Sequence, residues 1–387
     1  MNYRINPKNG DRLSLLAFGC MRLPKDFAVT EKIIKTAIDE GVNYFDTAYF
    51  YPGSENALGR VLENNYLRDK VFIATKCPTF FIKKTSDFDK YFKIQLERLR
   101  TNRIDYYLMH MLNGPENWQK LVDLGALEWI ESKKKSGEIK NLGFSFHGGA
   151  ENFRKLIDAN DWDFTLIMYN YYDVNNQAGR DGLYYAAEKG VPVMVMEPLR
   201  GGKLADLPIK AKNMFAAELP AHTPVEWAFR WIYSHNEVLT VLSGMNSMEM
   251  VKNNIKTASD ADSYKLTNRE NELIASAREL IMAKTKIPCT GCNYCMPCKH
   301  KVDIALCFAC YNDIAIEGKT KAFFDYTYRT RGHRASFCVG CGECEARCSQ
   351  GIEIRKNLKE VKKKLEGGLL KPVGGLIRAY LGENRED

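Results

Sequence analysis

The sequence predicts an α/β protein in which a (β/α)8 barrel is followed by a small cysteine-rich domain. Two observations predict this arrangement. Short apolar runs alternate eight times with segments of helical periodicity over the first 260 of the 387 residues. Ten of the twelve cysteines then fall between Cys289 and Cys348. A repeated strand–helix unit builds a parallel sheet with helical crossovers, and eight units approach the roughly 250 residues of a closed barrel.

The expected strands are short apolar runs at residues 15–18, 42–45, 71–75, 105–109, 141–144, 164–168, 191–195 and 238–242. The helices expected between them occupy residues 30–40, 55–65, 86–100, 118–136, 150–158, 179–189, 224–234 and 247–256. Gly41, Gly137 and Gly190 stand at the ends of three of these helices, where glycine commonly terminates a helix. A doubly wound open sheet is the alternative, but no Gly-x-Gly-x-x-Gly turn follows the first strand.

Composition excludes several classes of protein. Hydrophobic residues make up 45% and charged residues 27% of the chain, as in globular enzymes rather than disordered chains. The net charge of +8 arises from Lys and Arg mixed with Glu and Asp, so we expect no nucleic-acid partner. The N-terminus lacks the apolar stretch of a secretion signal, and no run of about 18 apolar residues predicts a membrane span. We therefore expect a cytoplasmic protein whose clustered cysteines bind metal or carry redox chemistry.

Two cysteine runs have the spacing of iron–sulfur ligands. One is Cys-x2-Cys-x2-Cys-x2-Cys from Cys289, and the other is Cys-x2-Cys-x2-Cys-x3-Cys from Cys338. In bacterial ferredoxins three closely spaced thiolates hold one [4Fe–4S] cluster, and the fourth cysteine of the run ligates the other cluster. Two structural zinc sites, each with four cysteine ligands, are the alternative. The ferredoxin rule predicts two clusters, one held by Cys289, Cys292, Cys295 and Cys348 and the other by Cys338, Cys341, Cys344 and Cys298.

We assign residues 1–285 to the barrel and residues 286–387 to a ferredoxin-like domain with two 4Fe–4S clusters and a C-terminal helical tail. This domain is expected to bury no core of its own, so that cluster binding and folding are coupled. Cys307 and Cys310 are expected to be buried thiols on an apolar helix. Further helices are expected at residues 268–284 and 354–365. Residues 369–387 are expected to pack against the rest of the protein, with a basic amphipathic membrane anchor as the alternative.

Chemically active side chains follow three successive predicted strands. Asp46, Lys76 and His110 stand at the ends of strands two, three and four, and Tyr51 lies five residues beyond Asp46. The C-terminal ends of the strands form the active site of such a barrel. Asp46 can neutralise Lys76, and a cation beside a tyrosine lowers the tyrosine pKa, which suits a general acid for a developing alkoxide. Taken singly, each residue also has a structural interpretation, such as a turn cap for Asp46 or a core histidine for His110.

At these residues the sequence resembles the aldo-keto reductase family. The matching stretches are FGCMRLP, GVNYFDTAYFYPGSE, VFIATK, RIDYYLMH, GEIKNLGFSFHG, MYNYYD, EPLRGG and GMNSMEMVKNN. Together with CTGCNYCMPCKHKVDI and CVGCGECEARC, they resemble a branch of the family that carries a C-terminal 4Fe–4S ferredoxin-type domain. The resemblance covers nearly the whole chain.

The resemblance implies an NAD(P)H-dependent carbonyl reductase with an Asp–Tyr–Lys–His tetrad. Tyr51 would protonate the carbonyl oxygen, Lys76 held by Asp46 would tune the tyrosine, and His110 would orient the carbonyl. The cofactor would supply the hydride. The resemblance also implies cofactor-binding positions at Gly19, Met21, Ser145, Leu199, Gly201, Gly244 and Asn254.

Several positions depart from the family pattern. Leu166 stands where the family usually has a glutamine for the nicotinamide amide, and Met196 stands where an aromatic ring often stacks. The basic residues that hold a 2′-phosphate are replaced by Gly244, Met245 and Met250. A pocket specific for NADP is therefore not expected.

The expected function is that of an oxidoreductase that reduces a small-molecule carbonyl substrate, with the clusters as an electron-transfer module. One alternative is an electron-transfer protein that uses the barrel as a scaffold for another redox enzyme, or that is driven by reduced ferredoxin rather than nicotinamide. Another is a regulatory module that binds nicotinamide without turnover. The intact tetrad favours the enzyme. Residues 311–337 are expected either to cover the barrel mouth or to dock a partner.

Overall fold

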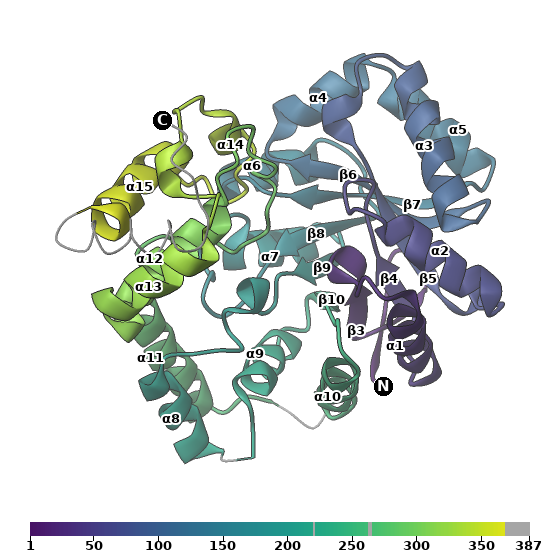
Figure 1. Ribbon diagram of the computed structural model, residues 1–387. Coiled ribbons are helices and arrows are strands. Elements are labelled where there is room, and N and C mark those ends of the chain that lie inside the picture. Colours follow the sequence, from purple (N-terminus) through teal and green to yellow (C-terminus); the bar gives the residue numbers. More distant parts are fainter. Residues whose placement is uncertain (220, 262–264, 368–387) are drawn as a thin grey trace. The chain divides into compact units, whose positions relative to one another are not determined.

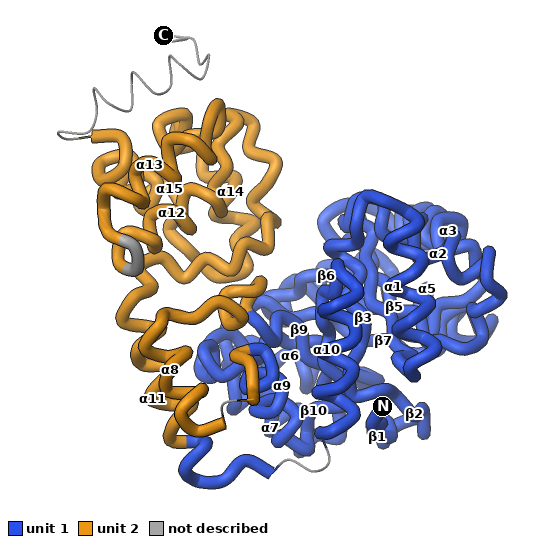
Figure 2. The backbone as a smooth tube through the Cα atoms, turned by 60° about the horizontal axis from the view of Figure 1, so that its bottom comes forward, with its two compact units in different colours: residues 1–199, 225–271 blue, residues 200–224, 272–387 orange. Residues whose placement is uncertain are grey.

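The computed structural model describes residues 1–219, 221–261 and 265–367, with nothing said of the side chains of residues 316 and 317. The chain divides into two compact units (Figure 2). Unit 1 comprises Met1–Leu199 and Val225–Asn271, and unit 2 comprises Arg200–Pro224 and the chain from Glu272 onward. Residues 200–224, which interrupt the barrel sequence, therefore group with the C-terminal part.

Unit 1 is a closed barrel of eight parallel strands (Figure 1). The strands run in the order β10-β3-β4-β5-β6-β7-β8-β9, so the chain closes the sheet by pairing its last barrel strand with its first. This confirms the barrel and excludes the doubly wound sheet. The strands are β3 (Leu16–Gly19), β4 (Tyr44–Asp46), β5 (Phe72–Cys77), β6 (Ile104–Leu112), β7 (Ile139–Phe146), β8 (Phe164–Met168), β9 (Val193–Met196) and β10 (Val238–Ser243).

Helices surround the strands, and most lie where the apolar periodicity predicts them (Figure 1). The helix expected at residues 118–136 is instead two helices, because Gly125 between them adopts a left-handed backbone with φ 87°. Glycine tolerates this conformation without steric cost, so the chain can turn there. The helices of unit 1 are α1 (Phe27–Asp39), α2 (Ser54–Asn64), α3 (Ser86–Leu99), α4 (Pro115–Asp123), α5 (Ala126–Lys135), α6 (Ala150–Asp158), α7 (Gly179–Glu188), α9 (Pro224–Tyr233) and α10 (Met248–Ser259).

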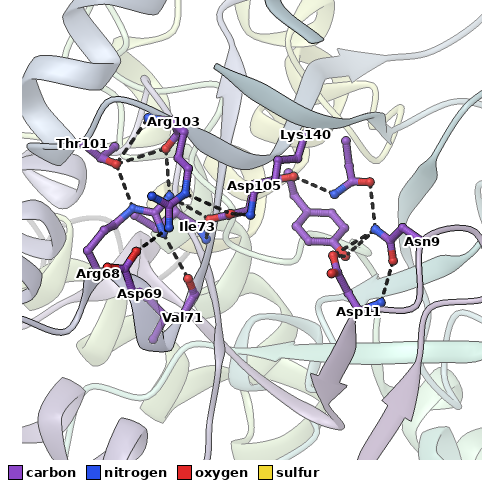
Figure 3. A network of polar contacts seen from close by, with 12 residues as sticks. Asn9, Asp11, Arg68, Asp69, Val71, Ile73, Thr101, Arg103, Asp105 and Lys140 are labelled. Atoms are coloured by element: carbon purple, nitrogen blue, oxygen red, sulfur yellow. Dashed lines mark hydrogen bonds and ion pairs between the residues drawn. The ribbon is translucent and has the colours of Figure 1, made fainter. Parts of the chain in front are cut away.

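A hairpin that the sequence analysis missed closes the N-terminal end of the barrel. It consists of β1 (Tyr3–Ile5) and β2 (Arg12–Ser14), which are antiparallel. The hydroxyl of Tyr106, near the start of β6, donates to Asp11 over 2.6 Å and accepts from Asn9 over 3.3 Å (Figure 3). The turn of the hairpin thus supplies polar partners for a tyrosine inside the barrel, which would otherwise bury an unsatisfied hydroxyl.

An ion-pair cluster at the same end of the barrel joins three strand starts. Asp105, at the beginning of β6, pairs with Arg68 at 2.8 Å and with Lys140 at 3.0 Å (Figure 3). Arg68 also donates to the main-chain oxygens of Val71 and Arg103. These contacts lie at the opposite end of the strands from the candidate site, so we assign them to stability of the fold.

Unit 2 contains helices from both of its segments. They are α8 (Ile209–Glu218), which the sequence analysis missed, and α11 (Asn268–Lys284), whose first residues belong to unit 1, followed by α12 (Ile304–Glu317), α13 (Lys319–Arg329), α14 (Glu343–Ala346) and α15 (Ile354–Val361). The expected helix at residues 354–365 continues as a π-helical turn at Lys362–Glu366. The expected helix at residues 268–284 is confirmed residue for residue.

The expectation that the C-terminal segment buries no core is wrong. Phe308, Phe323 and Tyr326 are almost wholly buried in a hydrophobic core with Leu358 and Val361. Helix α13, which was not predicted, supplies two of these rings. The Tyr326 hydroxyl also donates to Glu366 over 2.6 Å and accepts from the main-chain nitrogen of Ala335 over 2.9 Å. Apolar packing therefore contributes to the shape of this unit.

Among the described residues, no helix has both the length and the apolar character needed to cross a bilayer. The segment 369–387, for which packing or a membrane anchor was expected, lies outside the described residues.

Candidate active site

The barrel brings the four predicted catalytic residues to neighbouring strand ends. Asp46 is the last residue of β4, Lys76 lies near the end of β5, and His110 lies in β6. The three strands are adjacent in the sheet, with Asp46 paired to Ala74 of β5. Tyr51 follows in the loop after β4. The C-terminal edge of the sheet therefore gathers residues that are 64 positions apart in the chain.

Asp46 and Lys76 form a buried ion pair. Lys76 Nζ lies 2.6 Å from Asp46 Oδ1 and also donates to the main-chain oxygen of Thr47 over 2.7 Å. The two side chains are 5% and 1% exposed, so neither charge is well hydrated. Burial lowers the pKa of Lys76, and the neighbouring carboxylate of Asp46 raises that pKa part of the way back. The pair fixes one ammonium group at the barrel mouth.

Tyr51 lies beside this ammonium group. Lys76 Nζ is 5.0 Å from the centroid of the Tyr51 ring, and the Tyr51 ring is half-buried. The rings of Tyr51 and His110 meet edge to face, with centroids 6.1 Å apart. A cation at this distance stabilises negative charge on a phenol oxygen, because the site is largely shielded from water. Tyr51 is the least buried of the four side chains, so it is the one that a molecule bound at the mouth could reach.

His110 is fully buried and neutral at physiological pH. Burial first, and then the positive charge of Lys76, hold the pKa of His110 well below its usual range. The loop after β5 contacts the same residue, since Thr79 Oγ1 donates to the main-chain oxygen of His110 over 2.7 Å. A neutral imidazole can donate one hydrogen bond to a carbonyl oxygen without competing with Tyr51 as an acid.

The backbone beside His110 is held by Ser145, one of the predicted cofactor positions. Met111 has φ 59°, a left-handed conformation that a non-glycine residue rarely adopts. Its main-chain nitrogen donates to Ser145 Oγ over 2.9 Å, and Ser145 is buried in β7. Strained backbone of this kind is common where a site must aim a side chain.

A polar network behind Lys76 was missed in the sequence analysis. Buried Glu55 on α2 accepts hydrogen bonds from Thr75 Oγ1 over 2.7 Å and from Gln95 Nε2 over 2.9 Å. Gln95 on α3 also donates to the main-chain oxygen of Lys76 and accepts from the Tyr107 hydroxyl over 2.9 Å. A glutamate four residues after Tyr51 offered a weak signal. Gln95 offered none, because it stands among the charged residues of an amphipathic helix.

A second histidine, His147, lies close to this group and was also not singled out from the sequence. It follows β7, and its main-chain nitrogen donates to Leu112 at the end of β6 over 2.9 Å. Burial lowers the pKa of His147 to about 4. The barrel mouth therefore contains two neutral imidazoles at physiological pH.

The predicted cofactor positions lie at or after the C-terminal ends of β3, β7, β9 and β10. Gly19 ends β3, and a Cβ there would make an ordinary contact, at 3.4 Å, with the Ser243 backbone at the end of β10. Asn254 on α10 donates to Ser243 Oγ over 3.0 Å. Met21, in the first of these loops, is 36% exposed.

The remaining predicted positions follow the last two strands. Leu199 comes after β9, Gly201 has φ 69° and belongs to unit 2, and Gly244 follows β10. Leu166 is part of the apolar barrel core, and Met196 packs against it. Leucine and methionine offer neither the amide partner nor the aromatic ring that the family pattern has at these two positions.

The eight predicted cluster ligands fall into two groups in unit 2. In the first, Cys289 interacts electrostatically with Cys292 and Cys348, and Cys295 interacts with all three. Main-chain N–H groups of Gly291 and Ile352 donate to the sulfurs of Cys289 and Cys348, both over 3.4 Å. The second group consists of Cys298, Cys338, Cys341 and Cys344, which line one cavity together with Cys295 of the first group.

Neither cysteine group is drawn together tightly. Within the described residues, no group of three or more His, Cys, Asp or Glu side chains is arranged so that it could bind a metal ion. Four thiolates around one zinc ion lie about 4 Å from one another, since each Zn–S bond is about 2.3 Å long. By contrast Cys307 and Cys310 are fully buried on α12 in the hydrophobic core, as expected.

Comparisons with known proteins agree with the barrel fold. The sequence profile described as "Aldo/keto reductase family" matches residues 15–278. The chain belongs to the aldo/keto reductase family. It is therefore an oxidoreductase of a family that uses NAD(P)H. The matched region ends before the first of the ten clustered cysteines.

Similar proteins whose names state an activity include a dehydrogenase and a reductase. L-galactose dehydrogenase of Arabidopsis thaliana is 24% identical over 290 residues, which are 66% of this chain and 87% of that protein. The NADH-specific methylglyoxal reductase of Escherichia coli is 23% identical over 271 residues, 57% of this chain and 81% of that protein. Among solved structures, the holo form of aldo-keto reductase AKR11C1 from Bacillus halodurans has a TM-score of 0.60. It is 24% identical, and the match covers 72% of this chain and 96% of that one.

Proposed function

We propose that this protein reduces a small-molecule carbonyl compound with NAD(P)H. The observation that carries the proposal is the position of one ammonium group. Lys76 Nζ is held 2.6 Å from Asp46 and 5.0 Å from the ring of Tyr51. The barrel mouth thus combines a phenol, a fixed cation and a neutral imidazole, which is the set that protonation of a carbonyl oxygen requires.

When bound at this mouth, NAD(P)H would be the source of the hydride that reduces the carbonyl carbon. The N–H of His110 holds the carbonyl oxygen in place, and that oxygen gains negative charge as the carbon is reduced. Tyr51 donates its hydroxyl proton to the oxygen, which completes the alcohol. The ammonium of Lys76 stabilises the phenolate left behind, and Asp46 keeps this ammonium charged and aimed at the ring. Solvent then returns a proton to Tyr51.

The chain offers a surface for a nicotinamide cofactor that does not favour NADP. The glycines at positions 19 and 244 leave main-chain groups accessible, and a side chain at Gly244 would meet nothing closer than 3.9 Å. Gly244, Met245 and Met250 carry no cation for a 2′-phosphate. We therefore propose Gly19, Met21, Ser145, Leu199, Gly201, Gly244 and Asn254 as cofactor-binding residues, with no selection for NADP over NAD.

We further propose that residues 286–387 form a ferredoxin-like domain with two [4Fe–4S] clusters, attached to a barrel of residues 1–285. Cys289, Cys292, Cys295 and Cys348 would hold one cluster. Cys298, Cys338, Cys341 and Cys344 would hold the other. Support comes from the spacing of the cysteines in the sequence, from the electrostatic grouping of four of the thiols, and from N–H donors to two sulfurs. Such clusters supply one-electron transfer, in which a redox protein such as ferredoxin could take part.

Replacement of Tyr51 by phenylalanine tests the enzymatic proposal. Tyr51→Phe should lower kcat for reduction of a simple aldehyde by NADH at least about a hundredfold, because a proton donor is lost. The matched control is Tyr66→Phe, since Tyr66 is 92% exposed and lies between the end of α2 and the start of β5. Equal turnover of the two variants would overturn the assignment of Tyr51 as the acid.

Elemental analysis of anaerobically purified protein tests the cluster proposal separately. We expect about eight iron atoms and about eight acid-labile sulfides per chain. Zinc without sulfide would overturn it. Because iron content and aldehyde turnover are measured independently, one proposal can fail while the other stands.

A further inference from the structure

Five aromatic rings form a continuous cluster on one side of the tetrad, which we call the aromatic wall. It consists of Tyr49, Phe50, Phe80, Phe81 and Tyr91. Phe50 is central, with its ring centroid 5.0 Å from that of Phe81 and 6.3 Å from that of Phe80. Phe81 in turn meets Tyr91 at 5.9 Å and Tyr49 at 6.2 Å. The rings come from the loop after β4, the short helix Thr79–Phe81 after β5, and α3.

The aromatic wall adjoins the proposed reaction centre. The ring of Phe50 lies 5.7 Å from that of His110, and Phe50 directly precedes Tyr51 in the chain. The helix that carries Phe80 and Phe81 is tied to the same histidine by the hydrogen bond from Thr79 to the His110 main chain. A substrate whose oxygen meets His110 and Tyr51 would therefore place its carbon substituent near these rings.

Two rings of the wall are open to solvent. Phe80 is 49% exposed and Phe81 is 43% exposed, although both pack against other rings of the aromatic wall. Adjacent exposed phenylalanines beside a polar reaction centre are typical of a ligand surface, where a few polar groups orient the ligand and apolar rings cover it. Ring faces also favour a flat partner, because aromatic groups pack in stacked or edge-to-face pairs.

We propose that the natural substrate class is an aromatic carbonyl compound, such as an aryl aldehyde or aryl ketone, whose ring packs on Phe80 and Phe81. The inference rests on the proposed carbonyl reduction and specifies its substrate. A sugar or other polyol aldehyde is the competing class. It would need several hydrogen-bond partners; Phe50, Phe80 and Phe81 supply none, and the wall offers only the two hydroxyls of Tyr49 and Tyr91.

The test measures substrate selectivity rather than activity alone. Steady-state kcat/KM with NADH is measured for benzaldehyde, cyclohexanecarbaldehyde and glyceraldehyde. Phe80→Ala and Phe81→Ala remove a ring, and Phe80→Leu keeps apolar bulk while it removes aromaticity. The matched control is Phe324→Ala, because Phe324 on α13 of unit 2 is also 45% exposed. Each variant is checked by circular dichroism, which is expected to be unchanged because the rings are half exposed.

We expect the parent protein to prefer benzaldehyde to glyceraldehyde. The ratio of their kcat/KM values should fall about tenfold in Phe80→Ala and in Phe81→Ala, as for the loss of one ring contact. Phe324→Ala should leave the ratio unchanged. A parent preference for glyceraldehyde, or the same ratio in the wall variants as in the control, would overturn the inference.

Binding without turnover separates this inference from the proposed reaction. Benzyl alcohol, which has the shape of the expected product, is titrated against each variant and followed by saturation-transfer NMR. Weaker binding by the wall variants than by Phe324→Ala supports the aromatic site even if no aldehyde is reduced. Equal binding overturns it. Absence of reduction by the parent, with Tyr51→Phe no different, would overturn the proposed function alone.

Discussion

The side-chain amide of Gln95 donates a hydrogen bond from Nε2 to the main-chain oxygen of Lys76 over 3.0 Å. The same nitrogen lies 2.9 Å from Glu55 Oε1 and from Thr75 Oγ1, so its two hydrogens are shared among three acceptors, and the Gln95 oxygen accepts from Tyr107. One buried side chain on α3 thereby connects α2, β5 and β6 behind the ammonium group of Lys76. Gln95 touches neither substrate nor cofactor in the proposed reaction, so we assign it a positioning role.

Replacement of Gln95 by leucine should destabilise the barrel and misplace Lys76. The change leaves Glu55 and the Tyr107 hydroxyl with fewer partners, which costs about 2–3 kcal/mol of unfolding free energy. Urea unfolding followed by tryptophan fluorescence reports the barrel, because all five tryptophans lie in unit 1. A displaced Lys76 should also alter the pH profile of kcat. Gln119→Leu, on the exposed face of α4, is the control, and equal behaviour of the two variants would contradict the positioning role.

Acidification should destabilise the barrel through its buried histidines. The pKa of His147 is about 4 in the folded protein, against about 6.5 in an unfolded chain. Between these values the unfolded chain binds a proton that the folded protein does not, so stability falls as pH decreases from about 6.5 towards about 4. Above about pH 6.5 the effect vanishes. His147→Gln should therefore show a smaller drop in urea midpoint between about pH 7.5 and about pH 5 than the parent protein, whereas His300→Gln, an exposed change in unit 2, should show the parental drop.

Cysteine substitutions should remove iron one cluster at a time. Cys292→Ser and Cys348→Ser lie 56 residues apart, but each should lose about four irons per chain because both belong to one proposed ligand set. The double variant should lose no more than either single variant. Cys310→Ala should keep the full iron content, since Cys310 is buried in the hydrophobic core. A double variant without iron, or an iron-depleted Cys310→Ala, would refute the crossed assignment.

Gly59 should tolerate no side chain. A Cβ at this position of α2 would come into direct conflict with the main-chain oxygen of Arg98, at the end of α3. Alanine normally favours a helix by about 1 kcal/mol over glycine, but here it must push the two helices apart. We expect Gly59→Ala to lower Tm by several degrees. Gly149→Ala, where nothing lies within 4 Å, should leave Tm nearly unchanged, and a rise in Tm for Gly59→Ala would show that α2 and α3 can separate freely.

Local patterns in the sequence were enough to predict the barrel and the positions of the tetrad. Each strand is a short apolar run, and in each helix the apolar residues recur about every 3.6 positions. Both patterns can therefore be recognised within about ten residues. Strand β8 was predicted at its observed bounds, Phe164–Met168. Asp46, Lys76 and His110 could be placed at the mouth because the end of a parallel strand is also an end of the barrel. The spacing of the cysteines likewise predicted iron–sulfur ligands from the sequence alone.

Only the tertiary structure decided which side chains support and surround these residues. Gln95 meets Lys76, and Asp11 meets Tyr106, because the sheet closes and brings distant segments together. The same closure sets Phe80 and Phe81 beside Phe50 and His110 at the mouth. The apolar periodicity of a single segment cannot predict such contacts, because each contact depends on how two or more helices, strands or loops pack together. The sequence by itself therefore determined the barrel and the residues proposed to react, while the folded structure determined the N-terminal hairpin, the core of unit 2, and what holds and faces the proposed residues.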